Sequence, residues 1–502
     1  MRLIGLDVKS KASGVEVPPV PATVLALMTA CLVQKEYRFG ARVLTCALLL
    51  AALVAGGCGS VPSAKESLKP VAAAVTERAG PEVQFAWAQS ADEQAAIDDR
   101  VNTLLREPLN LDSAVQIAVL KSPSLRIALA EIQLSQADIL AASRLANPTL
   151  TASLRWPNSR PRGPDAEFSF AADLLNGLLI PLRRHWAERE VAGAQARMAD
   201  EMVRLITDVK KALVTFEAHQ LLHARIVDVL AADAATAELA QRQFEAGNIN
   251  QLDQLNQESA AQEAQLALLA DEQSIREDRE ALTRLLGLRD DHWRVEETLS
   301  APPALSFLAG DVLIGQALQQ RLDLKAARQA VENARAALDL KKRTRWLPAS
   351  IETGIDTERE SPGDRLTGPT LSFALPIFNQ GQDEVLRLTA EVSREKARAD
   401  SLEIAIASDV RVARARVQTA AQMVSFYTST LLPQRHQIVR ETLLHYNAMQ
   451  KSSYEVLAAK QQELAAQREE IEALRQYWLA RADLERAVGS AKLLTDPAAS
   501  RP

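Results

Sequence analysis

The sequence predicts a mainly α-helical fold with a membrane β-barrel component, organised as a twofold internal repeat. Three observations lead to this fold class. Long stretches carry almost no proline or glycine and have helical periodicity, four short segments alternate apolar and polar residues, and similar segments recur about 200 residues apart. Aromatic residues make up only 4% of the chain, which is low for a protein built mostly from sheet.

Composition excludes several classes of function. The chain has 58 basic and 64 acidic residues with their signs interleaved, so no basic face for the phosphates of nucleic acid is expected. All three cysteines lie at or before Cys58, which excludes a disulfide scaffold, a cysteine-ligated zinc site and a cysteine nucleophile from the body of the chain. The glycine and serine motifs of hydrolases and nucleotide-binding enzymes are missing, so we expect neither an enzyme nor a cofactor.

The N-terminal region has the parts of an export signal. The basic stretch Lys35–Arg42 precedes 12 apolar residues, Val43–Val54, and the small residues Ala55–Gly57. The apolar run is too short to span a bilayer as a helix, which takes about 20 residues. Cys58 is placed as in a bacterial lipoprotein processing site, and this resemblance implies acylation of its thiol and amine by fatty acids such as palmitate. Gly59 stands where an inner-membrane lipoprotein has Asp, which implies the outer membrane; the alternative is an uncleaved signal anchor with a chance cysteine.

A second apolar run, Ala22–Val33, precedes this signal. Since two tandem signals make little sense, we expect the true start at or after Met28, with residues 1–27 lying before it. No later segment reaches the length of a transmembrane helix. The expected organisation is a signal region at 1–57, a lipid-anchored extension at 58–104, a first repeat at 105–300, a second repeat at 301–490 and a C-terminal tail at 491–502.

The body of the chain has the pattern of a duplication. Ser124-Leu125-Arg126 resembles Asp323-Leu324-Lys325, and a long alanine-rich helical pattern follows each of them. Chance similarity between alanine-rich helices would not keep register across strands, turns and helix ends alike. The matching positions also include Pro148 and Pro348, Asp208 and Asp409, and Gly287 and Gly489.

Four segments alternate with the period of a β-strand. In the first, Leu150, Ala152 and Leu154 alternate with threonine and serine. One apolar face and one polar to acidic face are typical of strands with lipid on one side and water on the other. A half-buried soluble sheet alternates in the same way and is the alternative. The expected strands lie at about 148–156, 166–174, 349–357 and 369–377.

The helices are expected to form two long hairpins. Residues 182–243 contain no proline and only Gly193, which corresponds to a helix of roughly 90 Å that must lie against other helices. The return arm starts near Gln251 and has a mixed apolar and polar seam, which indicates one wet side, as in the wall of a tube. The second half repeats this plan, with residues 380–430 in the outward arm and 434–488 mostly in the return arm, and Pro433 is expected to break the outward arm before its end.

Together these features resemble the TolC-like outer-membrane efflux proteins, over about residues 105–490. Each local match is unspecific alone, and their combination with the lipid anchor and the repeat is specific. The matches are the strand-to-helix segment Gly368–Gly381, its lead-in Leu322–Leu324 with Leu347–Pro348, and the hairpin-tip turn Phe244–Gly247 with Leu252–Leu255.

The resemblance implies an oligomer. Four strands cannot close a barrel, because the smallest membrane barrels have about eight, and an open edge in lipid leaves backbone groups unpaired. The family implies a homotrimer with a 12-stranded barrel that continues into a helical-hairpin tunnel. It further implies an exit duct in the outer membrane that extends into the periplasm. Its partners would be a periplasmic adaptor (a membrane fusion protein) and an inner-membrane transporter of the resistance-nodulation-division type.

The hairpin tips are the expected place of adaptor contact, at about 244–255 and 446–457. The second tip departs from the family, since Ala448-Met449 stands where glycine is usual. Asp253 and Glu455 are candidate aperture charges that would form acidic rings in a trimer; the alternative is that both are solvated surface charges. The candidate contact residues are Phe244, Gly247, Leu252, Leu255, Tyr446, Met449, Tyr454 and Leu457.

The sequence specifies the substrate less closely than the fold. Leu375–Gly381 is similar to members that export heavy-metal cations. His219 and His223, spaced i, i+4 on one helix face, are weak metal-ligand candidates without a recognisable third ligand, so no metal site is predicted. A duct for drug efflux or type I protein secretion, or a periplasmic coiled-coil scaffold lipoprotein without a pore, are the alternatives.

Overall fold

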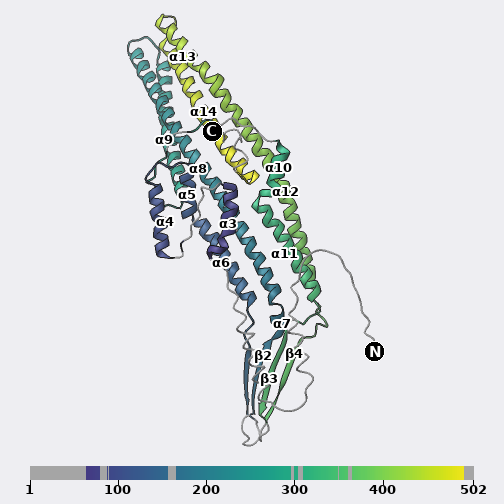
Figure 1. The fold of residues 1–502 in the computed structure, drawn as a ribbon. Helices are drawn as coiled ribbons and strands as arrows, with labels where there is room; N and C mark the ends of the chain where they lie inside the picture. The colour runs from purple at the N-terminus through teal and green to yellow at the C-terminus, as the bar shows by residue number, and fades with distance from the viewer. Residues whose placement is uncertain are drawn as a thin grey trace, which may run out of the picture. The chain divides into compact units, whose positions relative to one another are not determined.

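The computed structural model describes residues 64–79, 88, 90–156, 165–295, 299–302, 309–348, 350–359 and 365–490. The chain divides into two compact units, 1–59 and 60–502, and every described residue belongs to the second unit. The expected signal region, Cys58 and the C-terminal tail therefore lie outside the described residues. The described part is mostly helical and contains a four-stranded sheet (Figure 1).

The first half of this unit places a strand pair between short helices and a long helical hairpin. The order of elements is α3 (Ala64–Ala79), α4 (Ala91–Leu104), α5 (Leu111–Lys121), α6 (Pro123–Ser143), β1 (Thr149–Arg155), β2 (Asp165–Asp173), α7 (Leu174–Leu178), α8 (Ile180–Glu245) and α9 (Gln251–Leu286). α9 ends at Gly287, whose φ of 69° is left-handed. A Cβ at this position would lie 2.6 Å from the backbone oxygen of Lys121, so the close contact between the ends of α9 and α5 requires glycine.

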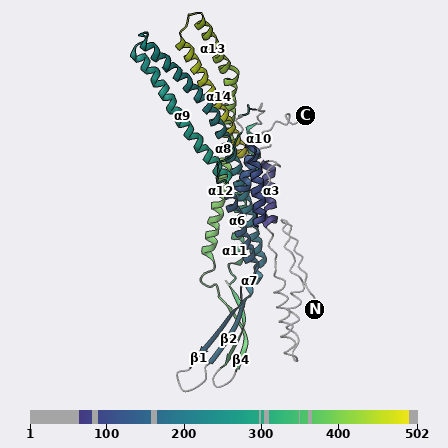
Figure 2. The same ribbon diagram turned by 90° about the vertical axis from the view of Figure 1, so that its left-hand side faces the viewer.

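The second half follows a similar order. Its elements are α10 (Gly310–Gln320), α11 (Leu322–Thr344), β3 (Ile351–Arg359), β4 (Arg365–Phe373), α12 (Gln382–Phe426), the π-helical turn η1 (Tyr427–Leu431), α13 (Leu432–Asn447) and α14 (Ser453–Val488). Figure 2 shows α9 returning beside α8 and α14 beside α13. Among the described helices, none combines the length and the apolar character needed to cross a membrane.

The outward arm of the second hairpin differs from the expectation. The outward arm is interrupted beside Pro433, as expected, but α13 continues it as far as Asn447, and the return begins only at Ser453. The π-helical turn Tyr427–Leu431 lies immediately before the proline. A proline ring clashes with the carbonyl four residues earlier in an α-helix, and the wider π turn accommodates it without ending the helix.

The strands form one antiparallel sheet in the order β1-β2-β3-β4. Its central pair joins the two halves of the chain, with Phe170 opposite Ile355 and Ser169 opposite Asp356. β4 begins at Arg365 and ends at Phe373, about four residues earlier than expected. Its register explains the end point, because Phe373 pairs with Ile351, the first residue of β3.

The apolar core lies among the helices, in two main clusters. In the first, α8 packs against α3, α5, α6 and α9, and Phe216 meets Trp293 edge to face with ring centroids 5.0 Å apart. In the second, α12 packs against α10 and α14 around Ile406 and the fully buried Tyr477. Burying side chains of this size stabilises the fold by about 1.5–3 kcal/mol each, so these clusters hold the long helices in register.

The helix α3 belongs to this core. Its Leu68, Val71 and Val75 are buried in the first cluster. The buried Arg78 donates hydrogen bonds of 2.9 and 3.1 Å to the carbonyl oxygen of Gln320 at the end of α10. This part of the 58–104 extension therefore connects both halves of the chain.

Candidate functional site

The two faces of the sheet differ sharply in character. The register aligns Leu150 with Phe170 and Phe170 with Ile355 on one face. These side chains are exposed, Leu150 to 74%. The apolar face also carries Leu154, Phe168, Leu371 and Phe373, all exposed.

The opposite face is acidic. Glu167 lies directly opposite Glu358, and like charges in such cross-strand positions destabilise a sheet unless water or cations screen them. Arg155 offsets part of this charge through an ion pair of 2.5 Å with Glu167. The acidic residues whose positions alternate onto this face are Asp165, Glu167, Asp173, Glu352, Asp356 and Glu358.

The sheet has two open edges. In the described part of the chain, β1 pairs only with β2 and β4 pairs only with β3. Each outer edge therefore presents a row of backbone N–H and C=O groups without strand partners, which is a template for pairing with another chain.

At the far end of α8 the first hairpin turns within a few residues. The N–H groups of Ala246, Gly247 and Asn248 donate to the carbonyls of Arg242, Phe244 and Gln243 at 3.1, 2.9 and 2.8 Å. Gly247 has a left-handed φ of 71°. The side chain of Asn250 then caps α9 by accepting from the N–H of Asp253.

The second hairpin makes the same turn without glycine. The N–H groups of Ala448, Met449 and Gln450 donate to the carbonyls of Leu444, Tyr446 and His445 at 3.1, 2.9 and 2.9 Å. Met449 has a φ of 57° and is the only non-glycine residue with positive φ in the described part of the chain. The departure from the family at Ala448-Met449 therefore leaves the turn geometry unchanged.

Most of the candidate contact residues are exposed at these turns. Met449 is 95% exposed and Leu252 is 67% exposed. Tyr454 and Leu457 are half-buried. The hydroxyl of Tyr454 donates a hydrogen bond of 2.9 Å to Oε1 of Gln243 and so connects the two hairpins. The exposed members of the set are Phe244, Gly247, Leu252, Leu255, Tyr446 and Met449.

The two candidate aperture charges have different surroundings. The carboxylate of Glu455 accepts a hydrogen bond from the backbone N–H of Ser452 in a capping box and forms an ion pair of 2.5 Å with Lys451. The hydrogen bond from Lys451 is the main cause that lowers the pKa of Glu455. Asp253 occupies the matching position in the first hairpin, and its carboxylate has no hydrogen-bond or ion-pair partner among the described residues. Asp253 is therefore the less compensated charge.

The two histidines pair with carboxylates across the first hairpin. His219 on α8 contacts Asp278 on α9 through Nδ1, and His223 contacts Asp271 at 2.8 Å. The hydrogen bond that His219 donates to Asp278 raises the pKa of His219 above its usual value. Within the ranges that the structure describes, no group of three or more histidine, cysteine, aspartate or glutamate side chains is arranged to hold a metal ion.

A polar seam between α8 and α14 was not predicted from the sequence. Lys210 and Lys211 pair with Glu485 and Asp483, each at 2.8 Å. Further along, the buried Asp233 accepts from Gln461. In the sequence, Lys210, Lys211 and Asp233 are simply charged residues on a helix, and periodicity alone assigns such residues to solvent.

Comparison with known proteins gives consistent matches. The family model for outer membrane efflux proteins matches residues 114–288 and 313–490. The cobalt-zinc-cadmium resistance protein CzcC of Cupriavidus metallidurans is 23% identical over 393 residues, which cover 76% of this chain and 90% of that protein.

Solved structures share the fold. The outer membrane protein VceC of Vibrio cholerae superposes with a TM-score of 0.61 at 17% identity, over 80% of this chain and 99% of its own. The CmeC outer membrane channel of Campylobacter jejuni superposes with a TM-score of 0.64 at 13% identity, over 81% of this chain and 91% of its own.

Proposed function

The chain belongs to the outer membrane efflux protein family, and from this premise we propose that it is the exit duct of a three-part efflux pump. Members of this family are channels and the chain is not an enzyme. The duct would lie in the outer membrane and extend into the periplasm. An inner-membrane transporter would drive substrate into it through a periplasmic adaptor that contacts the two hairpin tips.

The observation that carries this proposal is the sheet with one exposed apolar face and two open edges. An apolar face of this kind, with Leu150 at 74% exposure, is suited to lipid, and the acidic face is suited to water. Backbone groups at an edge in lipid each cost several kcal/mol, so the sheet must close. Three chains in a ring would pair every edge and form a 12-stranded barrel that continues into the helical tunnel.

We further propose that the two halves, at about 105–300 and 301–490, arose by duplication. The similar order of elements and the matching turns at Gly247 and Met449 support this. Lipid on Cys58 would tether the chain at the start of the extension that contains α3.

Heavy-metal cations are the substrate class that we favour. The relative CzcC carries cobalt, zinc and cadmium resistance in its name. The acidic face, with Glu167 opposite Glu358, would line the barrel and favour cations over anions. Drug efflux and type I secretion are the competing substrate classes, and a scaffold without a pore is the competing architecture.

The experiment compares two arginine substitutions on adjacent residues of β1. Leu150→Arg places a charge on the face assigned to lipid, at a cost of about 2–4 kcal/mol near the middle of the bilayer, whereas Thr151→Arg places it on the face assigned to water. We expect Leu150→Arg to abolish outer-membrane assembly, heat-resistant trimers and conductance in planar bilayers, and Thr151→Arg to retain all three. Equal behaviour of the two variants, or a monomer without conductance, would contradict the duct.

The substrate is tested separately in a deletion strain. We expect this strain to lose resistance to cobalt, zinc or cadmium, and the wild-type gene to restore it. Hypersensitivity to drugs alone, with unchanged metal resistance, would contradict the metal assignment and leave the duct intact.

A further inference from the structure

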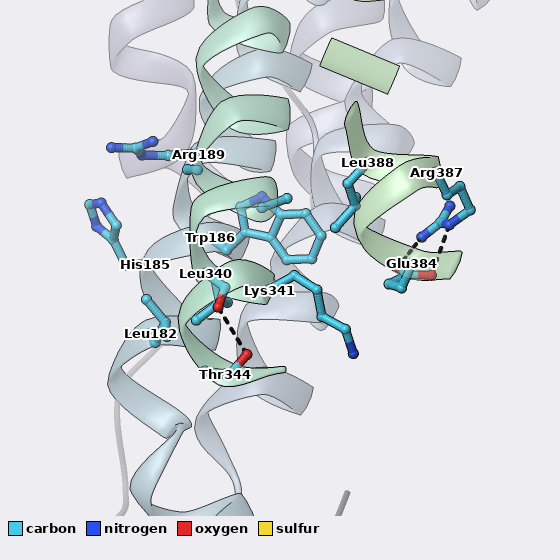
Figure 3. A pocket seen from close by; sticks show the side chains of 12 residues that line it. Leu182, His185, Trp186, Arg189, Leu340, Lys341, Thr344, Glu384, Arg387 and Leu388 are labelled. Carbon is cyan, nitrogen blue, oxygen red and sulfur yellow. Dashed lines mark hydrogen bonds and ion pairs between the residues drawn. The ribbon is translucent and has the colours of Figure 1, made fainter. Parts of the chain in front are cut away.

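A cavity of about 240 Å³ lies where α8, α11 and α12 come together (Figure 3). Its apolar part is formed by Trp186 of α8, Leu340 of α11 and Leu388 of α12, and the indole of Trp186 lies between α11 and α12. A second cavity of about 430 Å³ adjoins it and shares Trp186, Ala337, Arg387 and Leu388. The proposed duct function does not use either cavity.

All three walls of the first cavity lie next to the sheet. Leu182 to Arg189 form the first turns of α8, which follows β2 and the short α7. Ala336 to Thr344 form the last turns of α11, which precedes β3. Glu384 to Leu388 open α12, which follows β4. The lining residues nearest to the sheet lie 9, 7 and 11 residues along the chain from β2, β3 and β4, whereas Arg189 lies 16 residues from β2, which is roughly 24 Å at 1.5 Å per residue.

The polar rim of the cavity is cationic. Arg189, Lys341 and Arg387 line it together with one carboxylate, Glu384. Arg387 is paired with Glu384 at 2.5 Å, and Lys341 interacts electrostatically with the same carboxylate. Arg189 has no hydrogen-bond or ion-pair partner among the described residues. The rim thus carries an excess of positive charge in a chain whose net charge is −6.

The surroundings extend this charge. The end of α11 carries Lys342 and Arg343, both exposed, and the guanidinium of Arg345 lies 4.7 Å from the ring centroid of Trp346. Tryptophan beside lysine and arginine is typical of the interface between membrane and water. Clusters of basic residues beside a membrane-spanning segment bind anionic lipid headgroups.

The size of the cavity limits what it holds. Pockets that enclose a whole small molecule have about 300–1,000 Å³, so 240 Å³ admits only part of a larger ligand. An apolar interior with a cationic rim fits the upper part of an acyl chain joined to a phosphate. A free inorganic anion would leave the surfaces of Trp186 and Leu388 unfilled.

We propose that this cavity binds an anionic phospholipid. The phosphate would lie at Lys341, with Arg189 adding positive charge at the rim, and an acyl chain would lie against Trp186 and Leu388. This inference rests on the proposed function only in that the latter places the sheet in the outer membrane. Bound lipid would fill the junction between the helices and the sheet.

The test uses the full-length protein purified in detergent. Micelles are doped with phosphatidylglycerol or with phosphatidylcholine of identical acyl chains, and retained lipid is counted by native mass spectrometry. We expect wild type to retain phosphatidylglycerol about tenfold more strongly, since each basic residue near an anionic headgroup contributes attraction. The double variant Arg189→Gln/Lys341→Gln should lose this preference. Ala337→Phe should lose the lipid too, because it fills the space without changing charge.

The matched control is Arg411→Gln/Arg416→Gln, which removes the same charge from exposed positions of α12 outside both cavities and should behave as wild type. Equal retention of both lipids, unchanged retention in the two cavity variants, or displacement of the lipid by inorganic phosphate would each overturn the proposal. Conductance of the same preparations separates the two hypotheses. A pore without lipid preference overturns only the lipid site, whereas lipid retention without a pore overturns only the duct.

Discussion

Met449 occupies in the second hairpin the same left-handed backbone position that Gly247 occupies in the first. Their φ angles are 57° and 71°, and the three hydrogen bonds around each residue join equivalent atoms. The left-handed region costs an L-residue about 1–2 kcal/mol relative to glycine. The second tip therefore carries backbone strain that the first tip lacks. Because the side chain of Met449 is 95% exposed, no packing compensates for this strain within the chain.

Substituting Met449 by glycine should relieve this strain. We expect Met449→Gly to stabilise the tip by about 0.5–1 kcal/mol, the backbone gain less the greater entropy of glycine in the unfolded state. Native-state hydrogen exchange at the amides of Met449 and Gln450 measures it. The control Met449→Ala removes the same side chain and keeps Cβ, so it should give no gain. Equal protection of these amides from hydrogen exchange in Met449→Gly and Met449→Ala would show that relief of the left-handed backbone conformation does not cause the stabilisation.

The buried Asp233 should lower stability at neutral pH. Burial raises the pKa of Asp233, while the hydrogen bond from Gln461 lowers it to a smaller extent. The folded state thus binds the proton more readily than the unfolded state, so the buried carboxylate costs stability at high pH, and this cost falls as pH falls through the raised pKa. Asp233→Asn keeps an acceptor for Gln461 and should raise the melting temperature at pH 8.

The advantage of Asp233→Asn should shrink as the pH is lowered toward the raised pKa of Asp233. The control is Glu258→Gln, which removes a charge from an exposed position on α9 and should have little effect at either pH. A melting-temperature difference for Asp233→Asn that stayed constant between pH 8 and pH 5 would contradict this account.

The pair between His219 and Asp278 should make the first hairpin more stable in mild acid. The hydrogen bond with Asp278 raises the pKa of His219, while burial and, to a smaller extent, the nearby Arg475 oppose this rise. The stabilisation is therefore fully present below the unfolded pKa of about 6.5 and is lost as pH rises through the raised value. His219→Asn keeps a donor but does not titrate.

Urea unfolding of wild type and His219→Asn at several pH values measures this effect. We expect the free energy of unfolding of wild type to rise relative to that of His219→Asn as the pH is lowered from 8 to 6. In an Asp278→Asn background the same comparison should show no pH dependence. A pH dependence that persisted in the Asp278→Asn background would mean that a group other than this pair causes it.

The two tip carboxylates should contribute unequally to cation selectivity in the assembled duct. Glu455 is held by its capping box and by Lys451, whereas the carboxylate of Asp253 has no such partner among the described residues. We expect Asp253→Asn to reduce cation over anion selectivity in planar bilayers more than Glu455→Gln does. Reversal potentials in a salt gradient measure this. The opposite order would indicate that Asp253 faces away from the conducting path.

Sequence periodicity predicted the long helices well, because burial of one face of a helix repeats at fixed spacing. It located β4 less well. Leu375 and Ile377 continue the alternation beyond the strand, but the ladder stops at Phe373, where its partner Ile351 begins. Where a strand ends depends on the neighbouring strand, and alternation within one segment does not contain that information. Pro433 correctly indicated a break in the outward arm, and a π turn accommodates the proline there without ending the arm.

By itself the sequence determined where the long helices lie, which face of each strand is apolar, and about where both hairpins turn. These properties follow from local spacing and from the chemistry of single residues. The tertiary structure alone decided that α3 enters the core, that Arg78 reaches Gln320, that Asp233 meets Gln461, and that a cationic cavity forms beside the sheet. Each of these brings together residues far apart in the chain, and their contact depends on how whole helices pack.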